Sequence, residues 1–406
     1  MTQPKLTDQC FDIRYEQGVH AAEFTQDAPE DLCEYVNSYL SKVSKYRNMT
    51  PERPYATYSL YQPPLATAAG KRSLLMRLRR KYERVRIPAT VTVGTTKHCQ
   101  CVCQHCSADY HMASFRPQLP LKTLLAGVQE AVELGVTNII LVGGEPLLHK
   151  GVFDLIAGID SDKANVVMFS NGELLTPANC RKLKDAGLFG LYVSLDDVDG
   201  TKHNAARARP GLFAKACQGV RNANEAGLVA GISSYLTHEK LVAGDFESMM
   251  ELGRELGARE ITFFDAIAVG RNDDNNKQHT FLTSQDRLDI DRLTRLYRKR
   301  PEYPALSPQS VLTSAEGSGF CFAANTQFYL SATGEVTPCD FTPLTAGRYP
   351  DQSIAELWRL LTDNDIYRKR SAVCRMQDPE FRNQTINRIP INAERPYPIA
   401  SLLAQD

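Results

Sequence analysis

The sequence lacks an excess of either charge. Its 47 Lys and Arg residues balance 47 Asp and Glu residues, so the formal net charge at pH 7 is +0. Proteins that bind nucleic acid or membrane surfaces through their overall charge carry a basic surplus. The balanced charge excludes binding of nucleic acid or membranes through the overall charge of the protein. Any such binding must depend on a local group of charged residues.

The sequence also lacks a long apolar run. The first residues contain no hydrophobic segment typical of a signal peptide, and no later run approaches the roughly 18 apolar residues of a membrane-spanning helix. Eleven Cys residues, an odd number unevenly clustered, favour metal or cluster chemistry in a reducing compartment over a disulfide framework. We therefore expect a cytoplasmic protein.

The densest group of cysteines follows a β-branched run at residues 89–93. Cys99, Cys103 and Cys106 have three and then two residues between them. On a short loop this spacing lets three sulfur atoms turn toward one point, which suits a cubane iron–sulfur cluster with one iron left without a protein ligand. A zinc site completed by a nearby His or Cys, and a buried apolar group of cysteines, are the alternatives that the spacing leaves open.

From residue 87 onward, short apolar strands alternate with amphipathic helices. The expected strands are 90–93, 138–142, 165–169, 191–195, 228–235 and 260–264. This alternation is typical of parallel βαβ units, in which right-handed crossovers bring the carboxyl ends of all strands to one face. We expect an α/β fold with its chemistry at that face.

Polar or glycine-rich residues follow several of these strands. They are Gly143, Gly144, Glu145 and Pro146 after the second strand, Ser170 and Asn171 after the third, and Ser194 and Asp196 at the end of the fourth. Ala266 lies in the segment 265–271 that follows the sixth strand. Glycines let the backbone approach a ligand closely, and the polar side chains offer hydrogen-bond partners.

The cysteine spacing and the order of these motifs resemble the radical S-adenosylmethionine (SAM) superfamily. The resemblance implies a partial (β/α)6 parallel barrel in which Cys99, Cys103 and Cys106 hold a 4Fe-4S cluster, with SAM chelating the open iron. It further implies a flavodoxin- or ferredoxin-type electron donor, reductive cleavage of SAM, and a 5′-deoxyadenosyl radical that abstracts hydrogen from a substrate. In such an enzyme the protein binds the cluster and SAM, orients them and seals the site, while the cofactor carries out the difficult chemistry.

The resemblance also implies how SAM is held. The Gly-Gly-Glu-Pro motif at residues 143–146 binds the SAM amino group in this family. Ser170, Asn171, Ser194 and Asp196 are of the types that hydrogen-bond the ribose hydroxyls and the methionyl carboxylate.

Three further positions follow from the same resemblance. His105 stands where relatives place an aromatic side chain against adenine, and Ala266 lies in the adenine-side segment. The stretch from His203 to Arg207 is similar to a family motif whose Arg pairs with the SAM carboxylate. We assign that role to Arg207, with Arg209 as the alternative.

Residues 301–406 form the expected third region. Cys321, Gly334 and Cys339 fit the spacing C-x(9–15)-G-x4-C around a predicted β-hairpin. This resembles the SPASM and twitch extensions of the superfamily, which hold auxiliary iron–sulfur clusters. Cys374 alone follows, so we expect at most one auxiliary 4Fe-4S cluster, held by Cys321, Cys339 and Cys374. Structural cysteines in a domain without a cluster are the alternative.

Residues 1–86 form the expected first region, an α+β extension. Two strands and a helix opened by Asp27 are either a peptide-recognition module or a scaffold packed on the barrel of residues 87–300. A basic helix over 71–86, with Leu75, Leu78 and Val85 on its apolar face, packs on the protein or contacts anionic lipid or an acidic partner.

The sequence thus predicts a radical SAM enzyme of oxidoreductase or bond-forming type, with no individual catalytic side chain assigned. Its substrate is a small metabolite or a peptide, and a maturase of natural-product precursor peptides is the narrower alternative. A non-catalytic iron–sulfur protein that docks on a partner is the alternative from another class. The motifs for SAM argue against that alternative.

Overall fold

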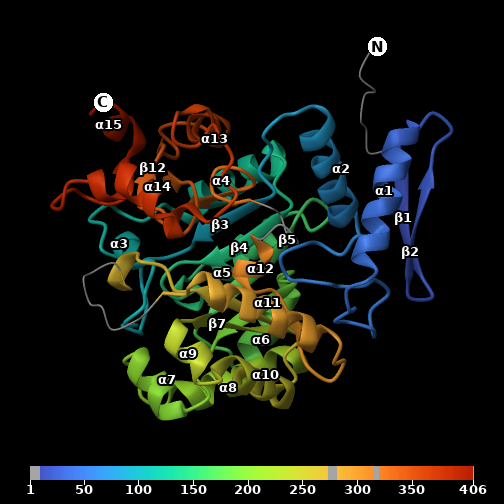
Figure 1. Cartoon of the computed structure of the whole chain (residues 1–406), viewed down its shortest axis with the longest axis horizontal. Coiled ribbons are helices and arrows are strands. Elements are labelled where there is room, and N and C mark those ends of the chain that lie inside the picture. The colour runs from blue at the N-terminus through green and yellow to red at the C-terminus, as the bar shows by residue number, and fades with distance from the viewer. Residues whose placement is uncertain (1–9, 273–280, 314–319, 406) are drawn as a thin grey trace.

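The computed structural model describes residues 10–272, 281–313 and 320–405. Its centre is one sheet with the strand order β13-β11-β10-β3-β4-β5-β6-β7-β8-β9, surrounded by helices (Figure 1). Within these described ranges, no helix is long and apolar enough to span a membrane. The first nine residues, which contributed to the expectation that no signal peptide is present, lie outside them.

Six consecutive strands of the sheet are parallel, as the sequence predicts. They are β3 (Thr90–Gly94), β4 (Asn138–Val142), β5 (Asn165–Ser170), β6 (Gly190–Ser194), β7 (Val229–Leu236) and β8 (Glu260–Asp265). Each pairs in parallel with the next, so their carboxyl ends share one edge. The predicted partial barrel of radical SAM type is confirmed.

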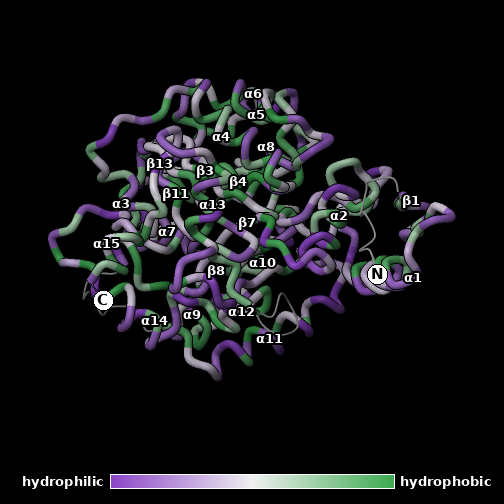
Figure 2. The backbone as a smooth tube through the Cα atoms, turned by 90° about the horizontal axis from the view of Figure 1, so that it is seen from above, coloured by the Kyte–Doolittle hydropathy of each residue, from purple (hydrophilic) through white to green (hydrophobic). Residues whose placement is uncertain are grey.

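The helices that follow these strands cover the outer face of the sheet. They are α3 (Asp109–Met112), α4 (Leu121–Leu134), α5 (Val152–Ala157), α6 (Pro177–Asp185), α7 (Gly200–Ala206), α8 (Leu212–Glu225), α9 (His238–Val242), α10 (Asp245–Leu256), α11 (Ser284–Arg298) and α12 (Gln309–Leu312). In α4, Leu124, Val128 and Val132 recur at helical spacing and are buried. Figure 2 shows hydrophobic residues concentrated along the central strands and hydrophilic residues toward the periphery.

The C-terminal region continues the same sheet. Its elements are β9 (Ala305–Leu306), β10 (Gln327–Leu330), β11 (Glu335–Thr337), β12 (Leu344–Thr345), β13 (Gly347–Arg348), α13 (Ile354–Asp363), α14 (Pro379–Gln384), β14 (Tyr397–Pro398) and α15 (Ile399–Leu403). The predicted hairpin is β10 and β11, and β10 pairs in parallel with β3. One hydrophobic core includes both Val91 of β3 and Phe328 of β10. The boundary near residue 300 stays a prediction, and the sheet runs across it.

The N-terminal region is a separate layer beside the barrel. The strands β1 (Phe11–Glu16) and β2 (Val19–Phe24) form a two-stranded antiparallel sheet, followed by α1 (Glu30–Val43) and α2 (Ala68–Tyr82). Phe11, Val36 and Leu40 share a small core with Leu74 and Leu78 of α2. Figure 1 shows the hairpin and α1 at the far end of the molecule, next to α2.

Two helix boundaries expected in the N-terminal region are wrong, whereas the capping box expected at the start of a later helix is confirmed. The helix α1 begins after Pro29, whose extended backbone makes it the N-cap instead of Asp27. The basic helix ends at Tyr82 because Arg84 adopts a φ of 55°, so Val85 lies beyond it and is 39% exposed. The predicted capping box between Thr283 and Asp286 opens α11.

A buried carboxylate fastens the N-terminal segment to the floor of the barrel. Glu260, the first residue of β8, is 1% exposed. It accepts hydrogen bonds from the Ser59 hydroxyl at 2.8 Å, the Leu60 amide at 2.8 Å and the Tyr192 hydroxyl at 2.6 Å. Burial raises the pKa of Glu260, and the three donors oppose that shift. The segment before α2 is therefore tied to two barrel strands through one side chain.

We expect the variant Glu260→Leu to lose stability, because it leaves these donors buried without an acceptor. Each orphaned donor costs about 1–3 kcal/mol, so the free energy of unfolding should fall by about 3 kcal/mol or more. Glu260→Gln keeps one acceptor oxygen and should lose less. Urea unfolding followed by circular dichroism measures both, with the exposed Glu133→Leu as control. Equal stability of Glu260→Leu and the control would contradict this account.

Candidate active site

The cysteine loop leaves β3 at the carboxyl edge of the sheet and is held by two later segments. The Val102 amide donates to the Arg207 carbonyl at 3.1 Å, at the end of α7. The Arg271 amide donates to the Cys106 carbonyl at 3.1 Å, just after β8. The loop is thus fixed by backbone contacts to segments more than a hundred residues downstream.

Four thiols lie on this loop. The Cys101 thiol is within hydrogen-bonding reach of Cys99 and Cys103, and this contact lowers the pKa of Cys99 to about 6. Burial raises the pKa of the Cys106 thiol to about 12. In the described ranges, no three His, Cys, Asp or Glu side chains are arranged as a metal site. The donor set itself fits an iron–sulfur cluster, because thiolates are its usual ligands. Cys101 is a further thiol that the sequence analysis did not assign.

The two glycines after β4 pack directly on this loop. The Gly144 amide donates to the Thr96 carbonyl at 2.7 Å, and the Glu145 amide donates to the His98 carbonyl at 2.8 Å. A Cβ atom on Gly144 would overlap the His98 carbonyl oxygen, and Gly143 has a φ of 138°. No other residue type fits here without displacing the loop that carries the cysteines.

Glu145 connects the glycine motif to the end of β5. Its carboxylate is 1% exposed and accepts hydrogen bonds from the Ser170 hydroxyl and the Asn171 amide, both at 2.8 Å. Burial raises its pKa to about 7, against these donors. Pro146 begins the helical turn Pro146–Leu148 that turns the chain away from the site. The motifs after the second and third barrel strands therefore form one hydrogen-bonded unit.

Asp196 and Arg207 form a buried pair beside the cysteine loop. The Arg207 Nε and Nη2 atoms donate to the two Asp196 oxygens at 2.6 and 2.9 Å. Burial opposes ionisation of the carboxyl, but the Arg207 guanidinium lowers the pKa of Asp196. The Arg207 Nη1 atom lies 3.9 Å from the Cys103 sulfur. Arg209 instead pairs with Glu173 at 2.8 Å, farther along the same turn.

His105 lies between this pair and β7. Its Nε2 atom is 3.4 Å from an Asp196 oxygen, and its ring lies 4.4 Å from the Tyr235 ring at 31°. Ser194 ends β6 beside these groups, half-buried, and Ala266 is buried after β8, where its amide donates to the Leu236 carbonyl. Tyr235 is a neighbour of the site that no sequence motif indicated.

The three late cysteines meet in the C-terminal region. The thiols of Cys321 and Cys374 share a hydrogen bond, which lowers the pKa of Cys321 to about 6. Cys339 lies close enough to Cys321 for the two sulfur atoms to interact electrostatically. The Thr342 hydroxyl lies 3.1 Å from the Cys339 sulfur. Residues separated by up to 53 positions thus lie near one another, although in the described ranges they are not arranged as a metal site.

A polar group beside Cys339 faces the barrel interior, and the sequence analysis missed it. The Gln327 amide donates to the Asp340 carboxylate at 3.2 Å and to the Thr92 hydroxyl at 3.4 Å. Burial raises the pKa of Asp340 to about 6. The adjacency of Asp340 to a predicted ligand was the only available signal, because its position depends on the pairing of β10 with β3.

An aromatic series fills the interior between the floor and the late cysteines. Adjacent ring centroids lie 5.5, 4.8, 6.0 and 6.0 Å apart along the series Tyr61, Tyr192, Phe169, Phe264 and Phe341. Phe341 follows Cys339 by two positions, so the auxiliary region reaches into the barrel. Phe341 thus brings the segment after Cys339 into ring contact with Phe264 of the barrel strand β8.

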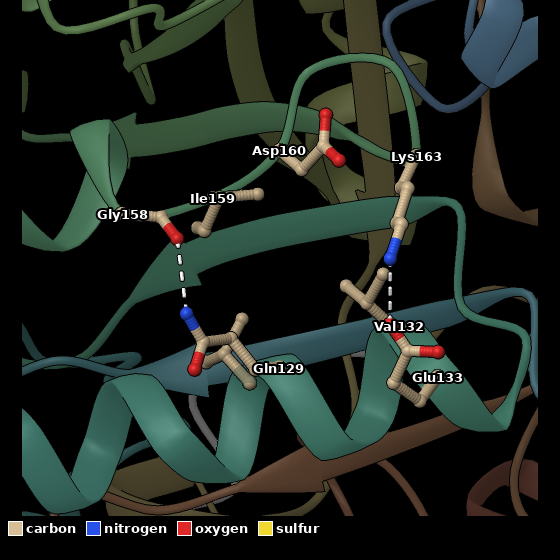
Figure 3. A pocket seen from close by; sticks show the side chains of 8 residues that line it. Gln129, Val132, Glu133, Gly158, Ile159, Asp160 and Lys163 are labelled. Atoms are coloured by element: carbon tan, nitrogen blue, oxygen red, sulfur yellow. Dashed lines mark hydrogen bonds and ion pairs between the residues drawn. The ribbon is translucent and has the colours of Figure 1, made fainter.

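A surface cavity of about 270 Å³ lies elsewhere, between α4 and the turn before β5 (Figure 3). Its walls include Lys163, which pairs with Glu133 at 2.8 Å, and Gln129, which donates to the Gly158 carbonyl at 3.2 Å. These residues are at the amino ends of β4 and β5. The cavity is thus at the opposite edge from the cysteine loop.

Comparisons with known proteins agree with this geometry. The model of the radical SAM superfamily matches residues 93–253, and that of the iron-sulfur cluster-binding domain named SPASM matches residues 321–382. The AdoMet-dependent heme synthase of Nitratidesulfovibrio vulgaris is 25% identical over 65% of this chain and 77% of its own length. The sporulation killing factor maturation protein SkfB of Bacillus subtilis is 24% identical over 67% of this chain and 65% of its own.

Solved structures share the fold. Streptococcus suis SuiB bound to the precursor peptide SuiA has a TM-score of 0.57 at 14% identity, covering 87% of this chain and 88% of SuiB. The enzyme anSMEcpe with bound AdoMet has a TM-score of 0.51 at 16% identity, covering 67% and 77%. At these identities the likeness is one of architecture.

Fold, motifs and matched domains define an enzyme of the radical SAM class. In particular, the chain combines a radical SAM domain with a C-terminal iron–sulfur domain of SPASM type. Its cofactors are SAM and a 4Fe-4S cluster, and the second domain implies an auxiliary iron–sulfur cluster.

We expect Glu145→Ala to weaken SAM binding by about 1.5–3 kcal/mol, the range for a lost hydrogen bond to a charged group. Isothermal titration of the reconstituted protein should show a dissociation constant roughly 10- to 150-fold higher. The iron content should stay near that of the unmodified protein. Glu145→Gln, which preserves the contact with Ser170, should retain more affinity. An unchanged dissociation constant at equal iron content would mean that SAM binds away from Glu145.

Proposed function

We propose that Cys99, Cys103 and Cys106 are the three protein ligands of the SAM-binding 4Fe-4S cluster. That cluster, once reduced, supplies the electron that splits SAM into methionine and a 5′-deoxyadenosyl radical. Cys101 remains a buried neighbour that does not bind the cluster. The spacing of the three ligands and the backbone frame from Arg207 and Arg271 support this assignment.

The strand-end residues bind and orient SAM in this proposal. Glu145 and the backbone around Gly143 and Gly144 take the amino group. Arg207 takes the carboxylate, because Asp196 occupies its Nε and Nη2 atoms and leaves Nη1 directed toward Cys103. Arg209 makes the same kind of two-point pair with Glu173, but its side chain is 40% exposed, whereas that of Arg207 is 10% exposed and reaches the Cys103 sulfur.

The remaining contacts to SAM come from five residues around this core. Ser170, Asn171 and Ser194 hydrogen-bond its polar groups. His105 and the backbone at Ala266 border the adenine.

We assign Cys321, Cys339 and Cys374 to the auxiliary cluster. The convergence of these three thiols is the supporting observation. A substrate in the mouth of the barrel then lies between the two clusters, where Phe341 and Asp340 form part of its surroundings. Hydrogen abstraction and a following one-electron oxidation are compatible with this arrangement.

A peptide is the substrate class that the geometry supports best. Among the described residues, no third strand pairs with either edge of the two-stranded hairpin β1–β2, and adding a strand at such an edge is the way in which many domains bind extended peptides. The solved structure of SuiB, whose fold matches 87% of this chain, contains a bound precursor peptide. SkfB is named as a maturation protein. The direct test is to measure binding of a precursor peptide, which deletion of residues 10–29 should abolish.

A small metabolite is the second candidate. The matches to AdoMet-dependent heme synthases of Nitratidesulfovibrio vulgaris and Methanosarcina barkeri, at 25% and 26% identity, favour it. The small number of late cysteines favours it too. Turnover of a tetrapyrrole with no dependence on residues 10–29 would select this candidate over the peptide.

The same proposal includes a protein electron donor of flavodoxin or ferredoxin type and a cytoplasmic location. All eleven cysteines are free thiols in the structure, which agrees with a reducing compartment.

We expect anaerobically reconstituted protein to produce 5′-deoxyadenosine from SAM when dithionite is added. Cys103→Ala should abolish this product, because a site with two thiolates does not retain the cluster. Chromatography of the nucleoside products is the measurement. Cys101→Ala serves as the matched control and should retain the product. Product formed at the normal rate by Cys103→Ala would refute the ligand assignment.

We expect about eight irons per chain after full reconstitution, from two four-iron clusters. Replacing Cys321, Cys339 and Cys374 together by Ala should leave about four. That variant should still cleave SAM without substrate, because this chemistry belongs to the barrel. Iron analysis and electron paramagnetic resonance are the measurements. A single, SAM-perturbed cluster signal in the unmodified protein would overturn the auxiliary assignment.

A further inference from the structure

The second half of α2 and the turn after it carry a dense positive charge. Basic residues occupy six of ten positions between 77 and 86, namely Arg77, Arg79, Arg80, Lys81, Arg84 and Arg86, and Glu83 is the one acidic residue among them. Arg77, Lys81 and Arg84 are exposed. The neutral overall composition of the chain makes this local surplus distinctive.

A second basic segment follows α13. Arg368, Lys369 and Arg370 are consecutive and exposed, and Arg375 follows five positions later. The segment carries Cys374 directly before Arg375. Arg375 is therefore adjacent to one of the proposed auxiliary ligands, and its Nη2 atom donates to the Lys369 carbonyl.

The two segments form one surface, although almost 300 residues separate them in the sequence. The Arg86 Nη1 atom donates to the Tyr367 carbonyl at 2.8 Å, and its Nη2 atom donates to the Arg368 carbonyl. The Trp358 indole of α13 donates to the Arg86 carbonyl at 2.9 Å. Arg370 lies close enough to Arg80 and Arg86 to act on both electrostatically.

Like charges at this density oppose folding. Burial, together with Arg77 and Arg370, lowers the pKa of Arg80 to about 10, and burial with Arg370 and Arg375 lowers the pKa of Arg86. Two local ion pairs join Arg79 to Glu83 at 3.0 Å and Arg368 to Asp365 at 3.1 Å. They leave most of the positive charge uncompensated, so an external anionic partner is the simplest reason for the arrangement.

The residues of this surface favour a protein partner over a lipid surface. A helix that lies on a lipid surface needs a free apolar face, whereas Leu74, Leu75, Met76 and Leu78 of α2 are all buried against the protein. The neighbouring thiols are the ligands of the proposed auxiliary cluster, which is a redox site. Cys374 is half-buried and Val373 beside it is 55% exposed, so this site lies near the protein surface. A protein on this surface therefore approaches the auxiliary site closely.

We infer that residues 77–86 and 368–375 form the docking surface of an acidic one-electron carrier protein that serves the auxiliary cluster. One electron passes from the reduced cluster to the oxidised carrier, and no bond is formed or broken in the protein. The inference rests on the auxiliary cluster proposed above. It places this carrier at the C-terminal domain, away from the cysteine loop after β3.

The test uses the reconstituted full chain and purified flavodoxin as the acidic probe. In the variant Arg368→Glu, Lys369→Glu, Arg370→Glu, binding measured by isothermal titration should weaken at least about tenfold at low salt and lose most of its salt dependence. Electron transfer to flavodoxin, followed by stopped-flow absorbance, should slow by a similar factor. Iron content and dithionite-driven SAM cleavage should not change, because a small reductant needs no docking surface.

The control reverses three exposed charges elsewhere, with Arg181→Glu, Lys182→Glu and Lys184→Glu on α6. It should bind flavodoxin nearly as the unmodified protein does. Equal loss in both variants, or no loss in the first, would overturn the inference. So would binding to phosphatidylserine vesicles that depends on Arg368–Arg370 in the absence of flavodoxin binding. If the protein held only four irons but still bound flavodoxin through Arg368–Arg370, the assignment of the auxiliary cluster would be wrong. The docking surface itself would still stand.

Discussion

The backbone contact between the glycines after β4 and the loop after β3 is the constraint on which the site depends. The amides of Gly144 and Glu145 bond to carbonyls of the cysteine loop, at a separation that excludes a Cβ atom on Gly144. This contact brings the proposed cluster ligands and the proposed SAM ligands to the same place. Glu145 then extends the connection to Ser170 and Asn171, so three strand ends are held as one unit.

A second constraint couples the two groups of cysteines. The hairpin strand β10 adds to the barrel sheet beside β3, the strand that leads into the cysteine loop. Cys321 and Cys339, which flank this hairpin, are therefore positioned by the same sheet as the early cysteines, over one continuous core. Asp340 and Phe341 reach the barrel interior for this reason.

The N-terminal region depends on different contacts. A small core joins the β1–β2 hairpin and α1 to α2, and Glu260 ties the preceding segment to the barrel floor. Hydrophobic spacing identified α2, but the positive φ of Arg84 ended the helix earlier than the pattern indicated. At the start of α1, the sequence indicated Asp27 as the N-cap, whereas the chain begins the helix after Pro29.

The sequence by itself determined the parallel strand order, the cysteine motif and the glycine motif, because short apolar strands, fixed cysteine spacing and paired glycines are local patterns with few alternatives. Only the tertiary structure decided between Arg207 and Arg209 as neighbours of the cysteine loop, since the partners Asp196 and Glu173 come from other strand ends. It also decided the convergence of Cys321, Cys339 and Cys374, the position of Asp340, and the union of two basic segments far apart in the chain. These features arise from contacts between distant segments, whose distances no local pattern encodes.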